Sequence, residues 1–513
     1  MPFTRRQLLR ATGVGVGGAL LVHSASVGGV ADGGDDDDED RVFIHPADDR
    51  VTDVIDALEL LDGTLLHRYD NFDVVAARIP SSVRDELAAD SRVAELEDDP
   101  VIELTASGPS AERTDLGDGL IDVGFGDSDD DGDGVIDIGD DGLIGIGDDD
   151  DDGTDLSCLD HIGQRPAWGW DRIGADVPEE TGDGVDVAIL DTGIDTDHCD
   201  LEVAGGRSFT GLGSGSDYDD RHGHGTHCAG IVGALDNDIG VVGVAPEVNL
   251  YGVQVLEDDG RGHHSTMAAG IDWCLSNDVE IISMSFGSQR RSTTMDTVID
   301  SAVEEGHLLV ASAGNEGNSG PDSCDEETLT YPATHEGVIA VAAMDEDDSL
   351  ASYSSVGDEV DLLAPGSNVY STDAGNGYAH KSGTSMAAPY VSGAAALVWE
   401  RREETGPGPN AAVRDTLETT AEPVLDACAE GHGLVNAAAA TGADGSGGGS
   451  DDDGSDGDGS TGDGGGSDGS DGSDASDGPG GGQGLVDAVD PTSLWDRLTD
   501  AIDRLFSWLR NLF

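Results

Sequence analysis

The middle of the chain, residues 158–442, predicts an α/β domain built on a mainly parallel sheet with helices on both faces. Two observations support this prediction. Short apolar runs recur along the segment, and stretches with helical spacing separate them. Apolar-rich strands are typical of sheets that are buried on both faces, and intervening helices favour crossovers between parallel strands.

The apolar runs and the helical stretches give the expected elements of this domain. In these sheets, functional side chains gather at the carboxyl ends of strands. We expect strands at residues 185–190, 248–256, 279–284, 308–312 and 338–341, and helices at 267–276 and 294–305.

The charge of the chain is strongly negative. Its 513 residues include 107 acidic and 24 basic ones, with a net charge of −83, and Lys381 is the only lysine. Self-repulsion on this scale opposes folding at low ionic strength, but in molar salt the Debye length shrinks to about 3 Å. The apolar fraction of 37% is ordinary. We therefore predict a protein that folds and works in concentrated salt, and we exclude nucleic acid as a partner because phosphates would be repelled.

Residues 1–31 are predicted to be an export signal of the twin-arginine type, which carries folded proteins across a membrane. Arg5 and Arg6 precede an apolar stretch, residues 11–22, that is too short to span a bilayer. Export would allow disulfides. The six cysteines permit 15 complete pairings, among which the sequence does not choose: 158, 199, 228, 274, 324 and 428.

Residues 41–104 predict a small α+β domain, and residues 105–157 an acidic linker. The small domain is expected to have strands at 41–44, 74–80 and 101–104 and helices at 51–61 and 82–89. Within the linker, residues 129–140 match the spacing of a 12-residue calcium loop. Its last position is aspartate rather than glutamate and no flanking helices are evident, so a disordered linker is favoured.

The C-terminal part of the chain predicts a second linker, residues 443–484, followed by an amphipathic segment, residues 485–513. The linker is rich in Gly, Asp and Ser. Leucines and aromatic residues follow the helical period over residues 494–513, but six charged residues make this helix unsuited to cross a bilayer. Contact with a membrane or envelope, docking to a partner, and folding back onto the core all stay open.

Ser385 is the first candidate for chemistry. It lies in Ser382-Gly-Thr-Ser-Met-Ala-Ala-Pro389, and a run of small residues that suits a buried helix follows. At the start of such a helix, free N–H groups and the helix dipole favour developing negative charge, which suits a nucleophilic hydroxyl. An ordinary N-cap serine is the alternative, so the interpretation depends on finding a base and an acid elsewhere.

A base and an acid are present at His224 and Asp191. His224 precedes a Gly-Thr-His-Cys-Ala-Gly run, and Asp191 directly follows a predicted strand, where a buried carboxylate could orient the imidazole. His222, His224 and His227 could instead form a zinc cluster, but no glutamate lies at the helical offset that a zinc-dependent hydrolase needs. The Asp-Thr-Gly tripeptide also occurs in aspartic proteases, which require a second copy that this chain lacks.

Asn315 completes the candidate catalytic set. It ends the segment Ala311-Ser-Ala-Gly-Asn315 at the close of a predicted strand. Its side-chain amide can donate a hydrogen bond to an oxyanion together with the N–H of Ser385, and loss of such a donor typically costs about 3–4 kcal/mol of transition-state stabilisation.

The four motifs of Asp191, His224, Asn315 and Ser385, in this order, resemble those of the subtilisin-like serine proteases, the subtilases. The resemblance covers roughly residues 160–440, and the acidic composition is similar to that of halolysins, the secreted subtilases of salt-loving archaea. It implies the subtilisin-like sheet, and it implies that residues 41–104 are an inhibitory propeptide. The cysteine after His227 is typical of the proteinase K branch, in which it is free and buried.

The resemblance also implies substrate and calcium sites. Two segments would clamp a peptide substrate as an added β-strand: Gly260, Arg261, Gly262 and Ser285, Phe286, Gly287. A structural Ca²⁺ would be held by the side chains of Gln164, Asp200 and Asn237 and the carbonyls of Leu235, Ile239 and Val241. A weaker cation site is implied around Ala333, His335, Val338, Glu359 and Asp361. Residues 319–330 depart from the family pattern, which leaves the shape of the main specificity pocket open.

The sequence thus predicts a secreted, salt-dependent serine endopeptidase, made as a self-processed zymogen and stabilised by Ca²⁺. Its partners would be polypeptide substrates, its own propeptide, and a membrane or envelope through residues 494–513, with the protein extracellular or associated with the cell surface. The alternatives are a catalytically silent protein of the same fold that serves as a surface or binding module, and a zinc hydrolase.

Overall fold

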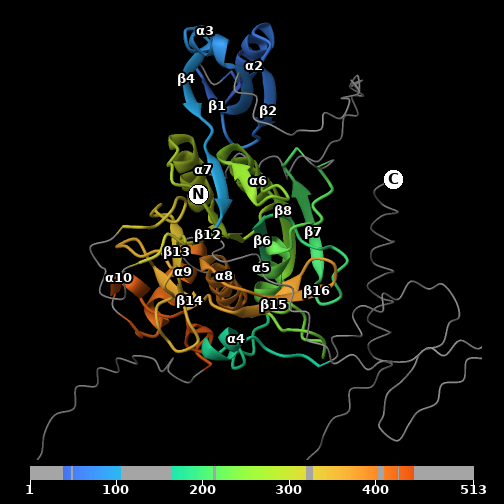
Figure 1. Cartoon of the computed structure of the whole chain (residues 1–513), viewed down its shortest axis with the longest axis vertical. Coiled ribbons are helices and arrows are strands. Elements are labelled where there is room, and N and C mark those ends of the chain that lie inside the picture. The colour runs from blue at the N-terminus through green and yellow to red at the C-terminus, as the bar shows by residue number, and fades with distance from the viewer. Residues whose placement is uncertain are drawn as a thin grey trace, which may run out of the picture. The chain divides into compact units, whose positions relative to one another are not determined.

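The computed structural model describes residues 39–47, 50–105, 163–211, 215–318, 327–402, 409–425 and 427–443 (Figure 1). The export signal, both linkers, the loop at 129–140 and the amphipathic segment at 485–513 lie outside these residues, so they stay predictions. The division into domains stays a prediction as well.

The larger part of the described chain is organised around a seven-stranded sheet in which every neighbouring pair is parallel. This confirms the predicted α/β class. The sequence did not indicate β7 (Val203–Ser208), which contains two glycines, or β14 (Leu362–Pro365), which has only four residues. The strand order is β14 (Leu362–Pro365), β13 (Val338–Met344), β12 (Leu308–Ser312), β10 (Ile281–Met284), β6 (Asp186–Asp191), β8 (Asn249–Gln254) and β7 (Val203–Ser208).

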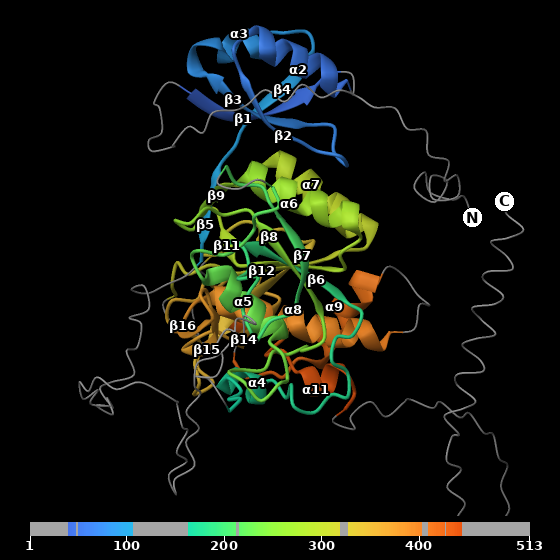
Figure 2. The same ribbon diagram turned by 90° about the vertical axis from the view of Figure 1, so that its right-hand side faces the viewer.

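Helices cover both faces of this sheet, as predicted (Figure 2). The side chains of β6 alternate between two hydrophobic cores: Val187 and Ile189 belong to one, and Ala188 and Leu190 to the other. The first core also contains residues of α5 (His224–Gly233) and α8 (Thr384–Arg401), and the second contains residues of α6 (His264–Asn277) and α7 (Thr293–Glu305). The other helices of this part are α4 (Trp168–Arg172), α9 (Pro409–Thr420), α10 (Ala427–Glu430) and α11 (Ala437–Ala440).

Helix α5 packs very closely against a two-stranded hairpin, β15 (Val369–Asp373) and β16 (Gly377–Lys381). All ten residues of α5 are buried. A Cβ atom added at Gly230 would lie only 2.2 Å from Oγ1 of Thr372 and 2.5 Å from Oγ of Ser371. The small residues that predicted a buried helix are therefore required by the close approach of the hairpin.

Residues 39–98 form a four-stranded antiparallel sheet with its own small hydrophobic core. The two predicted helices and the first two predicted strands are present. The sequence did not indicate β2 (Thr64–Arg68) and β4 (Val93–Asp98), in which charged or exposed side chains interrupt the apolar pattern. The sheet order is β2 (Thr64–Arg68), β3 (Val75–Pro80), β1 (Glu39–Pro46) and β4 (Val93–Asp98), with α2 (Val51–Leu60), η1 (Ser81–Val83) and α3 (Arg84–Ala88) beside it.

The strand predicted at residues 101–104 exists as β5 (Val101–Leu104), but it does not pair with the sheet of the small domain. It lies in a separate sheet, between β9 (Arg261–His263) and β11 (Phe286–Gly287) of the larger part. Ile102 is fully buried in the core that contains α6 and α7. The burial of that side chain, which no local pattern reveals, decides where the strand pairs.

No helix of the described segments is both long enough and apolar enough to cross a bilayer.

The packing of α5 predicts that Gly230→Ala destabilises the fold. The added methyl group collides with side chains of β15, and overpacking of this kind costs about 1–3 kcal/mol in the free energy of unfolding. Denaturant unfolding in molar salt, in a Ser385→Ala background that prevents self-digestion, measures the change. Gly211→Ala is the matched control, because no atom lies within 4 Å of its added Cβ. Equal stability of the two variants would contradict the prediction.

Candidate active site

The structure brings Asp191 and His224 together at the carboxyl end of β6. Asp191 is the last residue of that strand, and His224 is the first residue of α5. Nδ1 of His224 lies 2.8 Å from Oδ1 and 3.0 Å from Oδ2 of Asp191. A Cβ at Gly225 would lie 2.1 Å from the carbonyl oxygen of Gly193, so a glycine is needed for the helix to come this close to the strand end. The carboxylate therefore fixes the orientation of the imidazole.

Burial and charge oppose each other at His224. Burial disfavours the imidazolium, but the adjacent carboxylate of Asp191 outweighs this effect, so the pKa of His224 is raised above its usual value. A raised pKa makes this imidazole a better proton acceptor. Its Nε2 atom is buried and has no hydrogen-bond partner among the described residues, so no neighbour there competes with the serine for it.

Ser385 lies at the start of α8, as predicted, and its side chain is fully buried. Its hydroxyl donates to the carbonyl oxygen of Ser285 at 3.1 Å, and its Oγ lies 2.8 Å from Oγ1 of Thr105. It makes no hydrogen bond to Nε2 of His224. Cys228 contacts both the carbonyl oxygen of Ser385 and Nδ1 of His224, which places the serine near the Asp191–His224 pair. The serine hydroxyl is engaged by neighbours other than the histidine.

Asn315 lies in the loop after β12, and its Nδ2 donates to the carbonyl oxygen of Thr105. The N–H of Ser385, the second donor expected for an oxyanion, makes no hydrogen bond to that oxygen in the described structure. A backbone carbonyl therefore lies where Asn315 can polarise it, next to the candidate nucleophile.

Thr384 orients Asn315, a role that the sequence reasoning missed. Its N–H and its hydroxyl donate to Oδ1 of Asn315 at 3.0 and 3.1 Å. Because the amide oxygen is occupied by these donors, the amide nitrogen faces Thr105. Thr384 precedes Ser385 in the motif, but its contact spans 69 residues of chain, so nothing local signals it.

The two segments assigned to substrate do receive an extended strand, which is β5 of this chain. Ile102 and Glu103 pair with Gly262 and Arg261, and Leu104 pairs with Phe286. Further bonds come from the N–H of Leu104 to the oxygen of Gly260 and from the N–H of Thr105 to that of Ser285. Residues 101–105 are therefore bound by backbone pairing on both sides.

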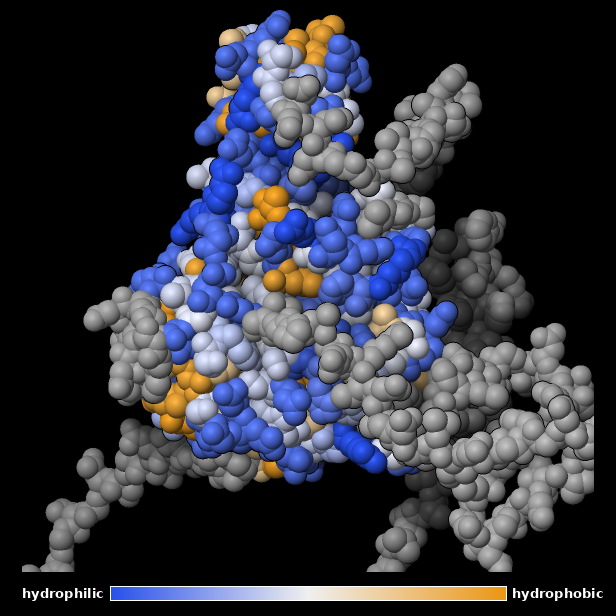
Figure 3. Space-filling model, in the orientation of Figure 1, coloured by the Kyte–Doolittle hydropathy of each residue, from blue (hydrophilic) through white to orange (hydrophobic). Residues whose placement is uncertain are grey.

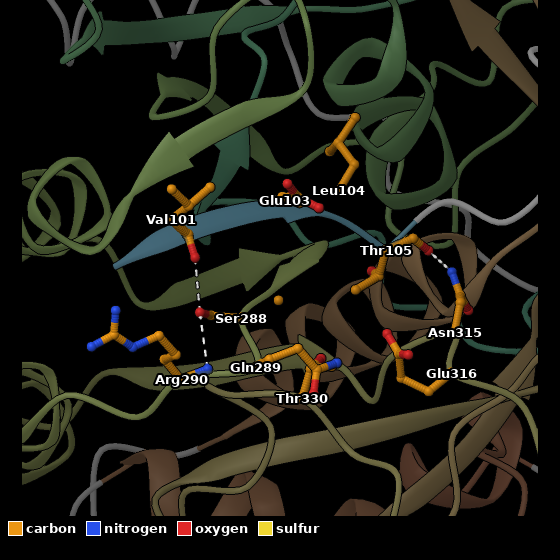
Figure 4. Close-up of a pocket in the computed structure, with 11 residues that line it drawn as sticks. Val101, Glu103, Leu104, Thr105, Ser288, Gln289, Arg290, Asn315, Glu316 and Thr330 are labelled. Carbon is orange, nitrogen blue, oxygen red and sulfur yellow. Dashed lines mark hydrogen bonds between the residues drawn. The ribbon is translucent and has the colours of Figure 1, made fainter. Parts of the chain in front are cut away.

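A cavity of about 490 Å³ lies beside the end of this strand (Figure 4). Figure 4 shows Thr105 opposite Asn315 and Glu316, with Thr330 on the far wall. A Cβ at Gly287 would lie 2.2 Å from Oγ1 of Thr330, so glycine is required where this wall meets β11. Thr105 is small relative to the space, so the cavity can admit a larger side chain.

The histidines do not form the zinc cluster that was kept as an alternative. His224 is engaged by Asp191, whereas Nε2 of His227 faces the carbonyl oxygens of Val369 and Ala379 at 3.1 and 3.0 Å. These two imidazoles serve different partners, so they do not share a metal site; among the described residues the group with ligand atoms close enough for one is Asp191, His224 and Cys228.

Among the described cysteines, Cys228 and Cys274 are free and buried, and Cys199 is disulfide-bonded. Sγ of Cys228 lies 3.5 Å from the carbonyl oxygen of Ser385 and 3.9 Å from Nδ1 of His224. Cys228 therefore packs beneath the two candidate catalytic residues.

The residues assigned to Ca²⁺ gather around Asp200. Gln164 donates to the carbonyl oxygens of Leu235 and Val241 at 2.7 and 3.0 Å, which places its amide beside two expected ligands. Asp200 is fully buried, and its Oδ1 has no partner among the described residues. Burial raises the pKa of Asp200 to about 6. Asn237 and Ile239 lie in the same loop, where Oδ1 of Asn237 accepts from the N–H of Ile239.

These residues fit a calcium ion once the side-chain amide of Gln164 is turned so that its oxygen, rather than its nitrogen, faces the carbonyls of Leu235 and Val241. The donor set is made of oxygen atoms from a carboxylate, amides and carbonyls, which Ca²⁺ prefers. An unpaired buried carboxylate oxygen is costly without a cation. When bound, the ion would compensate that charge and join the loop at 235–241 to the rest of the domain.

The weaker cation site differs from the site around Asp200, because an arginine already provides positive charge next to its carboxylates. The expected residues line a cavity of about 640 Å³, together with Arg414. Arg414 lies 2.7 Å from Asp361 and donates to the carbonyl oxygen of Glu336 at 2.8 Å. A guanidinium that neutralises Asp361 gives no support to a second bound cation.

Comparisons of the sequence with known proteins all point to the same protein family. The model of the subtilase family matches residues 182–462. Subtilisin NAT from Bacillus subtilis subsp. natto is 46% identical over 260 residues, which is 51% of this chain and 66% of that protein. Subtilisin BL from Lederbergia lenta is 43% identical over 281 residues, 54% of this chain and 99% of that protein. A thermostable alkaline protease from Halalkalibacterium halodurans is 43% identical over 283 residues, 55% of this chain and 74% of that protein.

The geometry around Asp200 predicts that calcium binding weakens in acid. The carboxyl must be ionised to bind the cation, so affinity should fall below pH 6, by about tenfold per pH unit when one proton competes. Without calcium, the stability of the fold changes with pH in the opposite direction. Because the pKa of Asp200 is raised in the folded protein, ionisation of its carboxyl destabilises the fold as the pH rises through about 6. Calcium titration followed by thermal unfolding at several pH values measures both effects.

Two substitutions sharpen this test. Asp200→Asn should abolish the calcium response and lessen the loss of stability at alkaline pH without calcium. Asp197→Asn removes the same charge from an exposed position three residues away and should leave the calcium response intact. A calcium response that survives in Asp200→Asn would refute the assigned site.

Proposed function

Because the chain belongs to the subtilase family, a family of serine endopeptidases, we propose that it is a secreted, salt-dependent serine endopeptidase made as a self-processed zymogen. One observation carries this proposal. The chain's own strand β5 leads to Thr105, whose carbonyl oxygen is bonded by Asn315 and whose side chain contacts Ser385. A peptide carbonyl is thus held next to a candidate nucleophile, a base and an oxyanion donor.

The first bond to be cleaved is then the one between Thr105 and Ala106. Oγ of Ser385 attacks the carbonyl carbon of Thr105, and its proton passes to Nε2 of His224. Asn315 stabilises the negative charge that forms on the carbonyl oxygen. His224 next gives the proton to the nitrogen of Ala106, which leaves, and water hydrolyses the Thr105–Ser385 ester. Asp191 stabilises the imidazolium throughout.

Residues 39–105 then act as the inhibitory propeptide. Two of their carboxylates bond to the first N–H groups of helices in the larger part. Glu97 accepts from the N–H groups of Thr293 and Thr294 at 2.7 and 3.0 Å. Asp99 accepts from the N–H and the hydroxyl of Ser265 at 2.8 and 2.6 Å. A carboxylate at a helix N-terminus is stabilised by free N–H groups and by the dipole, so these contacts keep β5 in the cleft.

A carboxylate of the larger part also accepts hydrogen bonds from residues 70 and 71, which supports the propeptide assignment. Asp272 of α6 accepts the N–H groups of Asp70 and Asn71 at 2.9 and 2.8 Å. The small sheet and the helices α6 and α7 are therefore joined by short hydrogen bonds that molar salt does not screen.

The remaining parts of the proposal concern salt and location. The net charge of −83 and the mostly hydrophilic face in Figure 3 support work in concentrated salt, where charge repulsion is screened. The twin-arginine signal supports secretion, and Ca²⁺ at Asp200 would stabilise the mature enzyme. The amphipathic segment supports contact with a membrane or envelope.

The proposed activity predicts that Ser385→Ala accumulates the uncleaved precursor. The wild type should show a break between Thr105 and Ala106, because this bond follows the carbonyl held by Asn315. Mass measurement and N-terminal sequencing of both proteins after refolding in molar salt decide the matter. Labelling of the wild type by a fluorophosphonate reports Ser385 directly. A folded wild type that is neither labelled nor cleaved would favour the catalytically silent alternative.

The proposed contact of residues 494–513 with a membrane or envelope makes a separate prediction. A chain that ends at residue 484 should keep its activity but no longer partition with cell envelopes, because the apolar face of residues 494–513 is lost. Fractionation followed by an activity assay measures both properties. Equal partitioning of the full and shortened chains would remove the envelope from the proposal and leave the protease untouched.

A further inference from the structure

Lys381 is the only lysine in a chain whose other basic residues are all arginines. It is the last residue of β16, four residues before Ser385, and its side chain is only 18% exposed. Its ammonium group donates to the carbonyl oxygen of Gly223 at 2.7 Å and to Oδ1 of Asp373 at 3.0 Å. Gly223 directly precedes His224. The single lysine therefore contacts the backbone next to the candidate base.

The backbone at Gly223 leaves little freedom for another arrangement. Its φ of 87° lies in the left-handed region, which favours glycine. A Cβ atom there would lie 2.0 Å from Oδ1 of Asp373, the same atom that Lys381 contacts. The carbonyl of Gly223 also accepts the N–H of His227 at 3.2 Å, as the first hydrogen bond of α5. Lys381 thus adds a charged donor to the carbonyl that begins this helix.

The rest of the N-terminus of α5 is held by Asp220. Its Oδ1 accepts the N–H groups of His222 and Gly223, both at 2.9 Å, and its Oδ2 accepts the N–H of Thr226 at 2.9 Å. Asp220 therefore binds the N–H groups and Lys381 binds the carbonyl. Together these contacts fix Gly223, the residue before His224, at both its N–H and its carbonyl oxygen.

Resting on the proposed protease function, we propose that Lys381 is a positioning residue for the catalytic histidine. It does not touch the reacting atoms. By holding the carbonyl of Gly223 it keeps the imidazole of His224 where Nε2 can take the proton of Ser385, and it links this helix start to the hairpin that leads into Ser385. An error of about 1 Å in the placement of a catalytic group can cost up to about 100-fold in rate.

The chemistry of the site explains why a lysine is found here. A compact ammonium group can direct separate N–H bonds to two acceptors, as it does here with a carbonyl and a carboxylate. A guanidinium is planar and larger, so its N–H groups are fixed in one fork. The site therefore favours the residue that the chain avoids at every other position.

Kinetics on the full chain after self-processing test this proposal. We expect Lys381→Met to lower kcat about 10- to 100-fold while KM changes less than about threefold, because substrate contacts are untouched. Rates are expressed per active site titrated with a fluorophosphonate, so that misfolded molecules do not count. Lys381→Arg keeps a charged donor and should recover part of the lost kcat.

The matched control is Arg221→Met. It removes a cation three residues before His224, but Arg221 is half exposed and pairs only with Asp217 among the described contacts. We expect its kcat to stay within about twofold of the wild type, as for an exposed ion pair. Thermal unfolding of each variant in a Ser385→Ala background separates stability from catalysis.

The outcomes distinguish this inference from the proposed function. A wild type that a fluorophosphonate does not label overturns the protease itself. An active wild type with an unchanged kcat in Lys381→Met, or a loss no larger than that of Arg221→Met, overturns the positioning role alone. A rise in KM without a fall in kcat also overturns it, because Lys381 would then act on substrate binding.

Discussion

The packing of α5 against the β15–β16 hairpin is the constraint on which the site depends. The hairpin contacts the helix along its length: Ser371 donates to the carbonyl of His227 at 2.9 Å, and Thr372 donates to that of Thr226 at 2.7 Å. Because the same hairpin continues into the loop before Ser385, the elements that carry the candidate base and the candidate nucleophile are positioned by one unit. Only small residues on α5 allow this approach.

Under the proposed function the described state is an inhibited one, and the hydrogen bonds explain how. The hydroxyl of Ser385 donates to Ser285 and contacts Thr105, while Nε2 of His224 has no partner. The strand that presents a carbonyl to Asn315 therefore also draws the hydroxyl away from the base. Catalytic hydrogen bonds are often absent from resting structures and form only in the reacting complex. Under the proposed function, one segment is both the first substrate and the first inhibitor.

The sequence predicted the parts of the site that depend on local motifs and missed those that depend on long-range contacts. Asp191 ends a strand and His224 begins a helix, so patterns within a few residues reveal both. The roles of Thr384 and Arg414 depend on partners 69 and 53 residues away. The same limit explains β5: its apolar pattern predicted a strand, but the burial of Ile102 in another core decided its neighbours. The calcium ligands were assigned through the family resemblance and stay a prediction, for which the unpaired oxygen of Asp200 is an independent reason.

The strongly negative charge of the chain explains why hydrogen bonds at contact distance, rather than long-range attraction, hold these parts together. A chain with 107 acidic residues gains little from long-range attraction in molar salt, where the Debye length is about 3 Å. Hydrogen bonds at contact distance survive that screening. Asp220 at α5, Asp99 at α6 and Glu97 at α7 each place a carboxylate on the first N–H groups of a helix, at 2.7–3.0 Å. These carboxylates act where their charge is matched by the adjacent helix dipole. The lone ammonium of Lys381 makes the complementary contact at a carbonyl, so short-range pairing does the work that long-range charge cannot do in salt.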